Sequence, residues 1–228
     1  MMLFAKYFKN PITTTVLRLL SVILIFAQAA FVLPAHADAY DDLLVAVKFD
    51  DIEVVRSLLN KGIDPNSVEA IRGETILMLA LREHSQKVFE ALLKQPDIKI
   101  EARANNGDTA IMLACFEGNV VAVKQLLEAD AQINRPGWTA LHYAAAKGNV
   151  EIIGILLEHS AYIDAASPND TTPLMMAVRS GKTDAVKFLL DEGADASLKN
   201  QSGMTALDFA LAFEQKEIAD LLKSIIKK

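Results

Sequence analysis

The sequence predicts an all-α solenoid of about six repeats, each a pair of antiparallel helices followed by a β-hairpin-like loop. The first observation is a pattern, Thr-x-Leu-x-x-Ala, that recurs at intervals of 34, 30, 33 and 33 residues, with Ile111 replacing Leu in one copy. The first four copies are each followed by a Leu-Leu pair, as at Leu156-Leu157, and in the last copy the outer Leu is replaced by Lys223. A single repeat cannot bury both sides of its helices, so such a chain gains stability by stacking its repeats. The five pattern threonines are Thr75, Thr109, Thr139, Thr172 and Thr205.

Each part of the repeat has a physical role. The threonine ends an extended loop and caps the first helix, whose first backbone N–H groups have no partner within the helix. Gly118, Gly148 and Gly181 then end that helix, because glycine takes the left-handed conformation at low cost. The second helix carries apolar residues at helical spacing, as at Ile152, Ile153, Leu156 and Leu157.

The N-terminus reads as a secretory signal peptide over residues 1–37. It contains Lys6, Lys9 and Arg18 but no acidic residue, then an apolar run, and it ends in Ala-His-Ala before Asp38. We expect cleavage after Ala37 and a periplasmic mature protein, with full secretion as the alternative. An uncleaved anchor over residues 16–33, which would make the protein a membrane-tethered adaptor, is the competing interpretation.

Charge and cysteine content limit the classes of partner. Without residues 1–37, 20 Lys and Arg remain against 29 Asp and Glu, a net charge of −9. Phosphate backbones and anionic lipids repel such a chain, so a protein partner is favoured and nucleic acid is not. The single cysteine cannot form an internal disulfide, so the core must hold the fold.

In register, these repeats resemble the ankyrin repeat over essentially all of residues 38–228. The best matches to its signature are Thr139-Ala-Leu-His-Tyr-Ala-Ala and Thr172-Pro173-Leu174. The resemblance implies that His142 hydrogen-bonds backbone and threonine between repeats. It also implies binding through a concave face built from the first helices and the loops. The repeats are expected at about 38–70, 71–104, 105–134, 135–167, 168–200 and 201–228, the first and last being polar caps.

Two departures from the pattern predict local changes. Pro96 stands where other copies have Gly62 and Gly193, and proline cannot take a positive φ, so that loop must be rebuilt. The loop containing residues 133–138 is three residues short. It predicts a truncated hairpin and a local notch in the row of loops.

No residue pattern indicates catalysis. His84, His142 and His159 are not at metal-ligand spacing, and no second cysteine joins Cys115. Cys115 falls at a position that is apolar in other copies, so we expect a buried thiol. We therefore expect no catalytic residue, no metal and no cofactor. The alternative, an enzyme or metal-binding protein, would require His142 and Cys115 exposed together in a pocket.

The candidate binding residues are large or basic side chains at first-helix positions expected to face solvent. Trp138, beside the short loop, is added because exposed tryptophan is frequent in binding hot spots. For Phe49 and Phe213, packing into the terminal caps is an equal possibility. We expect a monomeric, non-catalytic scaffold that binds an unknown protein, with an acidic surface, through Arg82, Phe116, Trp138, Lys147 and Arg179.

Overall fold

A computed structural model describes residues 39–226, so the signal-peptide interpretation of residues 1–37 lies outside the described residues. The chain divides into two compact units, residues 1–45 and 46–228. Residues 39–45 of the first unit are helical, and so are residues 46–48 of the second unit. Within residues 39–226, no helix is both long and apolar enough to cross a bilayer.

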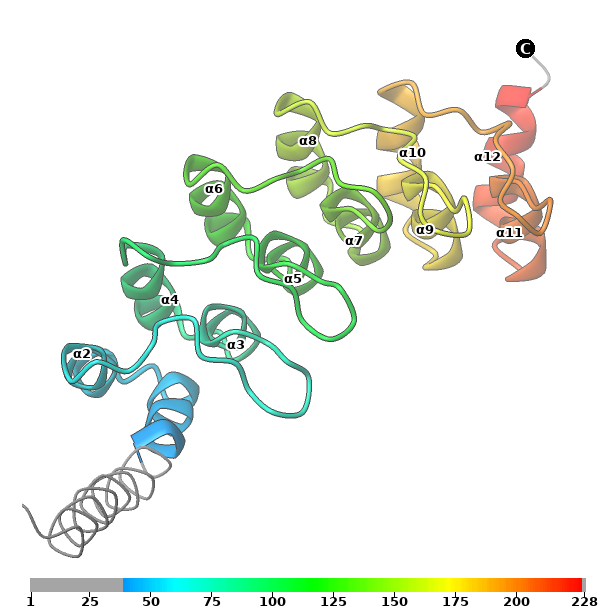
Figure 1. Cartoon of the computed structure of the whole chain (residues 1–228). Coiled ribbons are helices and arrows are strands. Elements are labelled where there is room, and N and C mark those ends of the chain that lie inside the picture. The colour runs from blue at the N-terminus through cyan, green and yellow to red at the C-terminus, as the bar shows by residue number, and fades with distance from the viewer. Residues whose placement is uncertain (1–38, 227–228) are drawn as a thin grey trace, which may run out of the picture. The chain divides into compact units, whose positions relative to one another are not determined.

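The second unit is a stack of helix pairs, which confirms the predicted fold class (Figure 1). The first helices, odd-numbered from α3, stand in one row and the second helices in another. The first helices lie on the inner side of the curve that the rows follow (Figure 1). The helices are α2 Ile52–Asn60, α3 Ile76–Arg82, α4 Gln86–Leu93, α5 Ala110–Glu117, α6 Val120–Glu128, α7 Ala140–Lys147, α8 Val150–Glu158, α9 Pro173–Arg179, α10 Thr183–Asp191, α11 Ala206–Ala212 and α12 Lys216–Ile226.

Local sequence sets where the helices begin and end. All five pattern threonines are N-caps of first helices, and Pro173 follows Thr172 as the first residue of α9. Gly118 and Gly148 end α5 and α7 in the left-handed conformation, with φ of 76° and 81°. Asn119 and Asn149 then cap the second helices α6 and α8 by accepting backbone N–H groups.

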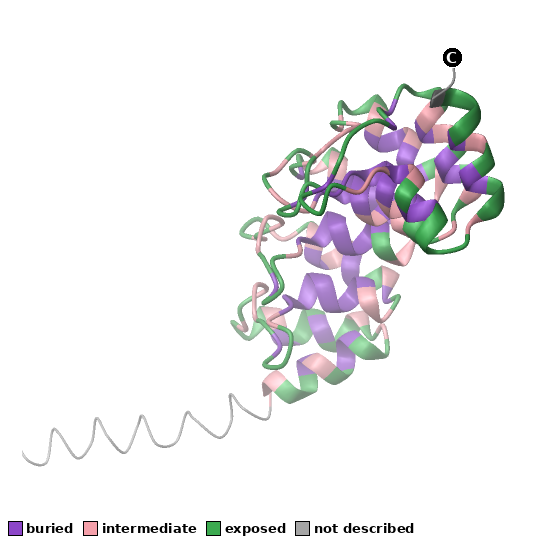
Figure 2. Ribbon diagram, turned by 90° about the vertical axis from the view of Figure 1, so that its right-hand side faces the viewer, coloured by how far each residue is buried: buried purple, intermediate pink, exposed green. Residues whose placement is uncertain are grey.

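The core lies between successive first helices and between each first helix and its second helix. Figure 2 shows buried residues concentrated inside the stack, with exposed residues along the loops and the outer helix faces. Each fully buried aliphatic side chain contributes roughly 1.5–3 kcal/mol. Leu211 of α11 occupies the position of Cys115, but it is 53% exposed in the described structure.

The loops contain no regular strand within residues 39–226; they hold one isolated antiparallel bridge, Val68 with Thr75. Their hairpin character rests on a few backbone hydrogen bonds, such as Ala104 N–H to Asp108 O at 2.9 Å. Side chains also join neighbouring loops by accepting a backbone N–H: Asn66 from Lys99, Glu101 from Gln132, Asn134 from Tyr162 and Asp164 from Asp195.

The predicted short loop is confirmed. Residues 129–138 join α6 to α7, whereas residues 159–171 and 192–204 make the corresponding connections later in the array. The loop is thus three residues shorter than these two. The rebuilt loop at Pro96 is a turn that follows α4. A hydrogen bond from Ile98 N–H to Gln95 O, at 3.2 Å, closes this turn.

Candidate protein-binding surface

Four residues at the ends of first helices occupy one register. Arg82, Phe116, Ala146 and Arg179 each lie seven residues after the threonine that caps their helix. Equal register in stacked helices places them along one side of the first-helix row. We call this side the inner face, defined by these four positions together with Lys147 at the end of α7.

Phe116 is the centre of an aromatic cluster on the inner face. Its side chain is 47% exposed and meets the Tyr143 ring edge-on, with ring centroids 6.3 Å apart. Lys147 Nζ stands 5.8 Å from the centroid of the Phe116 ring, a cation–π arrangement. The cluster therefore joins α5 to α7 and presents an exposed ring beside an exposed cation.

The hydroxyl group of Tyr143 is also hydrogen-bonded. It donates to the carboxylate of Asp108, in the loop before α5. Burial, and then the hydrogen bond and charge of Asp108, raise the pKa of Tyr143, so the phenol stays protonated as a donor. No local sequence pattern indicates this contact, because Tyr143 follows the signature histidine on α7 whereas Asp108 lies 35 residues earlier, in a preceding loop.

Arg82 is already ion-paired within the protein. Its Nε lies 3.0 Å from both carboxylate oxygens of Glu74, whose side chain is only 5% exposed, and Nη1 lies 3.8 Å from Glu117. The hydrogen bond that Arg82 donates to Glu74 raises the pKa of Arg82. Arg82 thus fixes loop 61–74 against α3, and its charge is balanced before any partner arrives.

Arg179 and Lys147 keep their charges available. Arg179 is exposed and has no ion-pair partner within the described part of the chain, and Lys147 is engaged through the Phe116 ring alone. These two cations, rather than Arg82, are the ones that an acidic partner could meet on the inner face.

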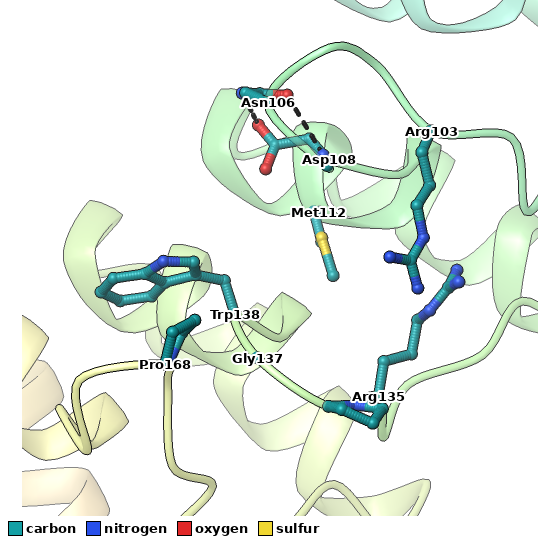
Figure 3. A pocket seen from close by; sticks show the side chains of 10 residues that line it. Arg103, Asn106, Asp108, Met112, Arg135, Gly137, Trp138 and Pro168 are labelled. Atoms are coloured by element: carbon teal, nitrogen blue, oxygen red, sulfur yellow. Dashed lines mark hydrogen bonds between the residues drawn. The ribbon is translucent and has the colours of Figure 1, made fainter.

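Trp138 lies at the end of the short loop, half-buried, with its ring edge-on to His142 at a centroid distance of 5.1 Å. It forms one wall of a cavity of about 180 Å³ between the loops, with the buried Met112 among its lining residues (Figure 3). On the side away from Trp138, the guanidinium groups of Arg103 and Arg135 point toward one another (Figure 3). The predicted notch is therefore a lined cavity.

His142 connects its own repeat to the next loop by hydrogen bonds. It is 1% exposed; Nδ1 accepts the Thr139 backbone N–H at 3.1 Å, and Nε2 lies 2.8 Å from the carbonyl oxygen of Thr171 in the next loop. A carbonyl oxygen can only accept, so Nε2 carries the hydrogen and the ring is neutral. Burial lowers the pKa of His142, which favours the same neutral form.

Cys115 is fully buried, as expected, and burial raises the pKa of its thiol. Because Cys115 and His142 are both buried, they do not form the shared exposed pocket that the enzyme alternative requires. Among residues 39–226, His, Cys, Asp and Glu do not gather in a group that could hold a metal ion.

The capping threonines differ in their bonding. The hydroxyls of Thr75, Thr172 and Thr205 accept the backbone N–H three residues on, at 3.3, 3.3 and 3.2 Å. The hydroxyl of Thr139 instead lies 2.9 Å from Nδ1 of His142. Thr109 Oγ1 is buried without a hydrogen-bond partner in the described structure. The same signature residue is thus used in three ways, all of them within the scaffold.

Stacked helix pairs with loops on one side define a class of repeat scaffold. A family model described as ankyrin repeats (3 copies) matches residues 30–104, 98–169 and 163–227, and the chain belongs to the ankyrin-repeat family. Ankyrin repeats mediate protein–protein interaction, and the fold is typically a non-catalytic module.

Known relatives share the repeats rather than a whole architecture. Human SH3 and multiple ankyrin repeat domains protein 2 is 34% identical over 75% of this chain, which spans 10% of that protein. Putative ankyrin repeat protein FPV031 of fowlpox virus is 34% identical over 80% of this chain, which spans 46% of it. The crystal structure of the ankyrin repeat domain of Bcl-3, a member of the IkappaB protein family, aligns with a TM-score of 0.66. It is 30% identical, over 79% of this chain and 81% of that chain.

Proposed function

We propose that this protein is an exported, non-catalytic binding module of the bacterial envelope that holds a protein partner against its inner face. The observation that carries the proposal is Phe116 of α5, a large aromatic residue left 47% exposed yet contacted by two side chains of α7, Tyr143 and Lys147. A ring already held in place loses little conformational entropy on binding, which favours its use as an anchor.

The charges around this anchor favour a partner with an acidic surface. Lys147 and Arg179 carry the free positive charge of the inner face, on a chain whose predicted mature net charge is −9. A local basic and aromatic patch on an acidic protein gives orientation and specificity toward an acidic polypeptide. The remaining acidic surface disfavours nucleic acid.

Export rests on residues 1–37, whose basic start, apolar run and Ala-His-Ala ending favour a cleaved signal peptide. N-terminal sequencing of the protein recovered from cells tests this part. A new N-terminus at Asp38 is expected. An intact N-terminus in the membrane fraction would replace the periplasmic proposal with the membrane-tethered adaptor.

The binding proposal is tested by affinity capture from an envelope extract with two matched triple variants. Phe116→Ala, Lys147→Ala and Arg179→Ala together remove the apolar and cationic groups of the inner face without touching the Arg82–Glu74 pair. Val121→Ala, Lys124→Ala and Lys187→Ala remove one exposed apolar and two exposed cationic groups from second helices.

The expected result is a partner, identified by mass spectrometry, that the wild type and the second-helix variant capture and the inner-face variant does not. Circular dichroism and thermal unfolding confirm that both variants are folded. A partner held equally by both variants would show that the binding surface lies elsewhere on the protein.

A further inference from the structure

The cavity beside Trp138 exists because the row of loops is broken there. On either side of the break, neighbouring loop tips are joined by a backbone hydrogen bond: Asn105 N–H to Arg72 O at 2.8 Å, and Gln201 N–H to Asn169 O at 3.0 Å. Within the described residues no such bond joins loop 129–138 to either neighbour. The three missing residues thus leave an opening where the other tips meet.

The arginine side of this opening carries positive charge. Arg135 is 12% exposed and gives one N–H to Glu101, which fixes the guanidinium while leaving its other N–H groups free. Arg103 is exposed and has no hydrogen-bond or ion-pair partner in the described structure. Its guanidinium points toward that of Arg135 (Figure 3).

The acidic group that also lines the cavity is already engaged. Asp108 accepts hydrogen bonds from Asn106 Nδ2 at 2.6 Å and from the Tyr143 hydroxyl, and it stands on the side away from the two arginines (Figure 3). The unpaired guanidinium of Arg103, together with the N–H groups of Arg135 that its bond to Glu101 leaves over, forms an anion-binding arrangement.

The size and the apolar walls select the kind of anion. A cavity of about 180 Å³ is smaller than the roughly 300–1,000 Å³ typical of cofactor and small-molecule sites. Trp138, Met112 and Pro168 give the opposite side an apolar surface. A single side chain with a carboxylate at its end and methylene groups behind it matches this combination.

We propose that the cavity receives the carboxylate of an Asp or Glu side chain from within the partner's chain, clamped by Arg103 and Arg135, while the partner's apolar neighbour packs on Trp138. This inference rests on the proposed function, because it assumes a polypeptide partner. An internal residue fits because protein surface continues past the notch on both sides, along the joined loop tips.

Trp138 is the protein's single tryptophan, so its indole N–H gives one NMR cross-peak that reports directly on the cavity. The probes are the blocked peptides acetyl-Leu-Glu-Leu-amide and acetyl-Leu-Gln-Leu-amide, with acetyl-Leu-Leu bearing a free C-terminal carboxylate as the third. Each is titrated into the purified wild-type protein, into Arg103→Gln, and into the control Arg56→Gln, which changes an exposed arginine on α2.

The glutamate peptide is expected to shift the indole peak and to bind about tenfold more tightly than the glutamine peptide, since hydrogen bonds between charged groups are the stronger ones. Arg103→Gln is expected to remove that preference and Arg56→Gln to keep it. Equal binding of the two peptides, an indole peak that no peptide moves, or a preference for the free C-terminus would each overturn the proposal.

This result is independent of the capture experiment, which depends on Phe116, Lys147 and Arg179. A captured partner together with an unresponsive indole peak would refute the acidic-residue clamp and leave the inner-face proposal standing. A responsive indole peak together with a partner that the inner-face variant captures as well as the wild type does would refute the inner-face proposal and leave the acidic-residue clamp standing.

Discussion

At the scale of single residues, polar side chains that resemble functional groups instead stabilise the scaffold, either between repeats or within one repeat. His142 bonds Thr139 within its own repeat and Thr171 in the next loop, and Arg82 bonds the buried Glu74. The role of His142 could be expected from its place in the repeat signature. The role of Arg82 could not, because its partner is eight residues earlier, in a loop whose path no local pattern specifies.

The neutral state of His142 predicts a loss of stability in acid. Since burial lowers the pKa of His142 in the folded protein, its contribution is fully present above the unfolded pKa of about 6.5. As the pH falls below that value, the unfolded chain binds a proton that the folded protein does not, and stability decreases toward the folded pKa. Urea unfolding between about pH 7 and pH 5 should therefore show a steeper loss for the wild type than for His142→Gln.

His159→Gln serves as the control because the His159 side chain is exposed. It should keep the wild-type pH dependence. Parallel pH profiles for the wild type and His142→Gln would mean that His142 titrates alike in both states, contrary to its buried bonding.

Because Arg82 is ion-paired within the protein and Arg179 is not, we predict that substitutions of these two arginines differ in their effect on stability. Arg82→Met leaves the buried Glu74 carboxylate with Arg72 alone and should lower the free energy of unfolding by about 1–3 kcal/mol. Arg179→Met removes an exposed, unpaired side chain and should change it by no more than about 0.5 kcal/mol. Equal effects in denaturant titrations would show that the Glu74–Arg82 pair contributes no net stability.

At the scale of elements, the loop between α6 and α7 is shorter than the repeat pattern requires, and this shortening changes the structure. The interval of 30 residues from Thr109 to Thr139 predicted the shortening, and the structure places a cavity there. The cavity's arginines were not predicted. Arg103 and Arg135 lie 32 residues apart, and neither holds a repeat-signature position.

Restoring the missing length should close the notch at little cost in stability. Inserting a copy of residues 167–169 of the later loop between Arg135 and Pro136 keeps both Trp138 and the Arg135–Glu101 pair and adds three residues; the added loop-closure cost is well below about 1 kcal/mol. Thermal unfolding should stay close to that of the wild type, while the glutamate peptide should no longer shift the indole peak. If the glutamate peptide still shifted the indole peak in the lengthened protein, peptide binding would not depend on the notch.

At the scale of the whole molecule, the repeat predicts the architecture far better than it predicts the function. Periodicity, threonine caps and left-handed glycines specify the stack, and burial of Cys115 followed from comparing equivalent positions. Binding residues are harder to predict because they vary among repeats by definition. Phe49 and Phe213 illustrate this: packing into the caps was an equal possibility for both, yet Phe49 is 74% exposed, whereas Phe213 is 48% exposed and stacks on the Phe209 ring.

The most direct test of the central claim is the dissociation constant of the captured partner, measured by calorimetry against the wild type, Phe116→Ala and Val121→Ala. The inner-face account predicts that Phe116→Ala weakens binding at least about tenfold, or roughly 1.4 kcal/mol. Val121→Ala, an equally exposed apolar residue on a second helix, should leave the constant unchanged. Unchanged binding by a folded Phe116→Ala protein would contradict the claim that this face holds the partner.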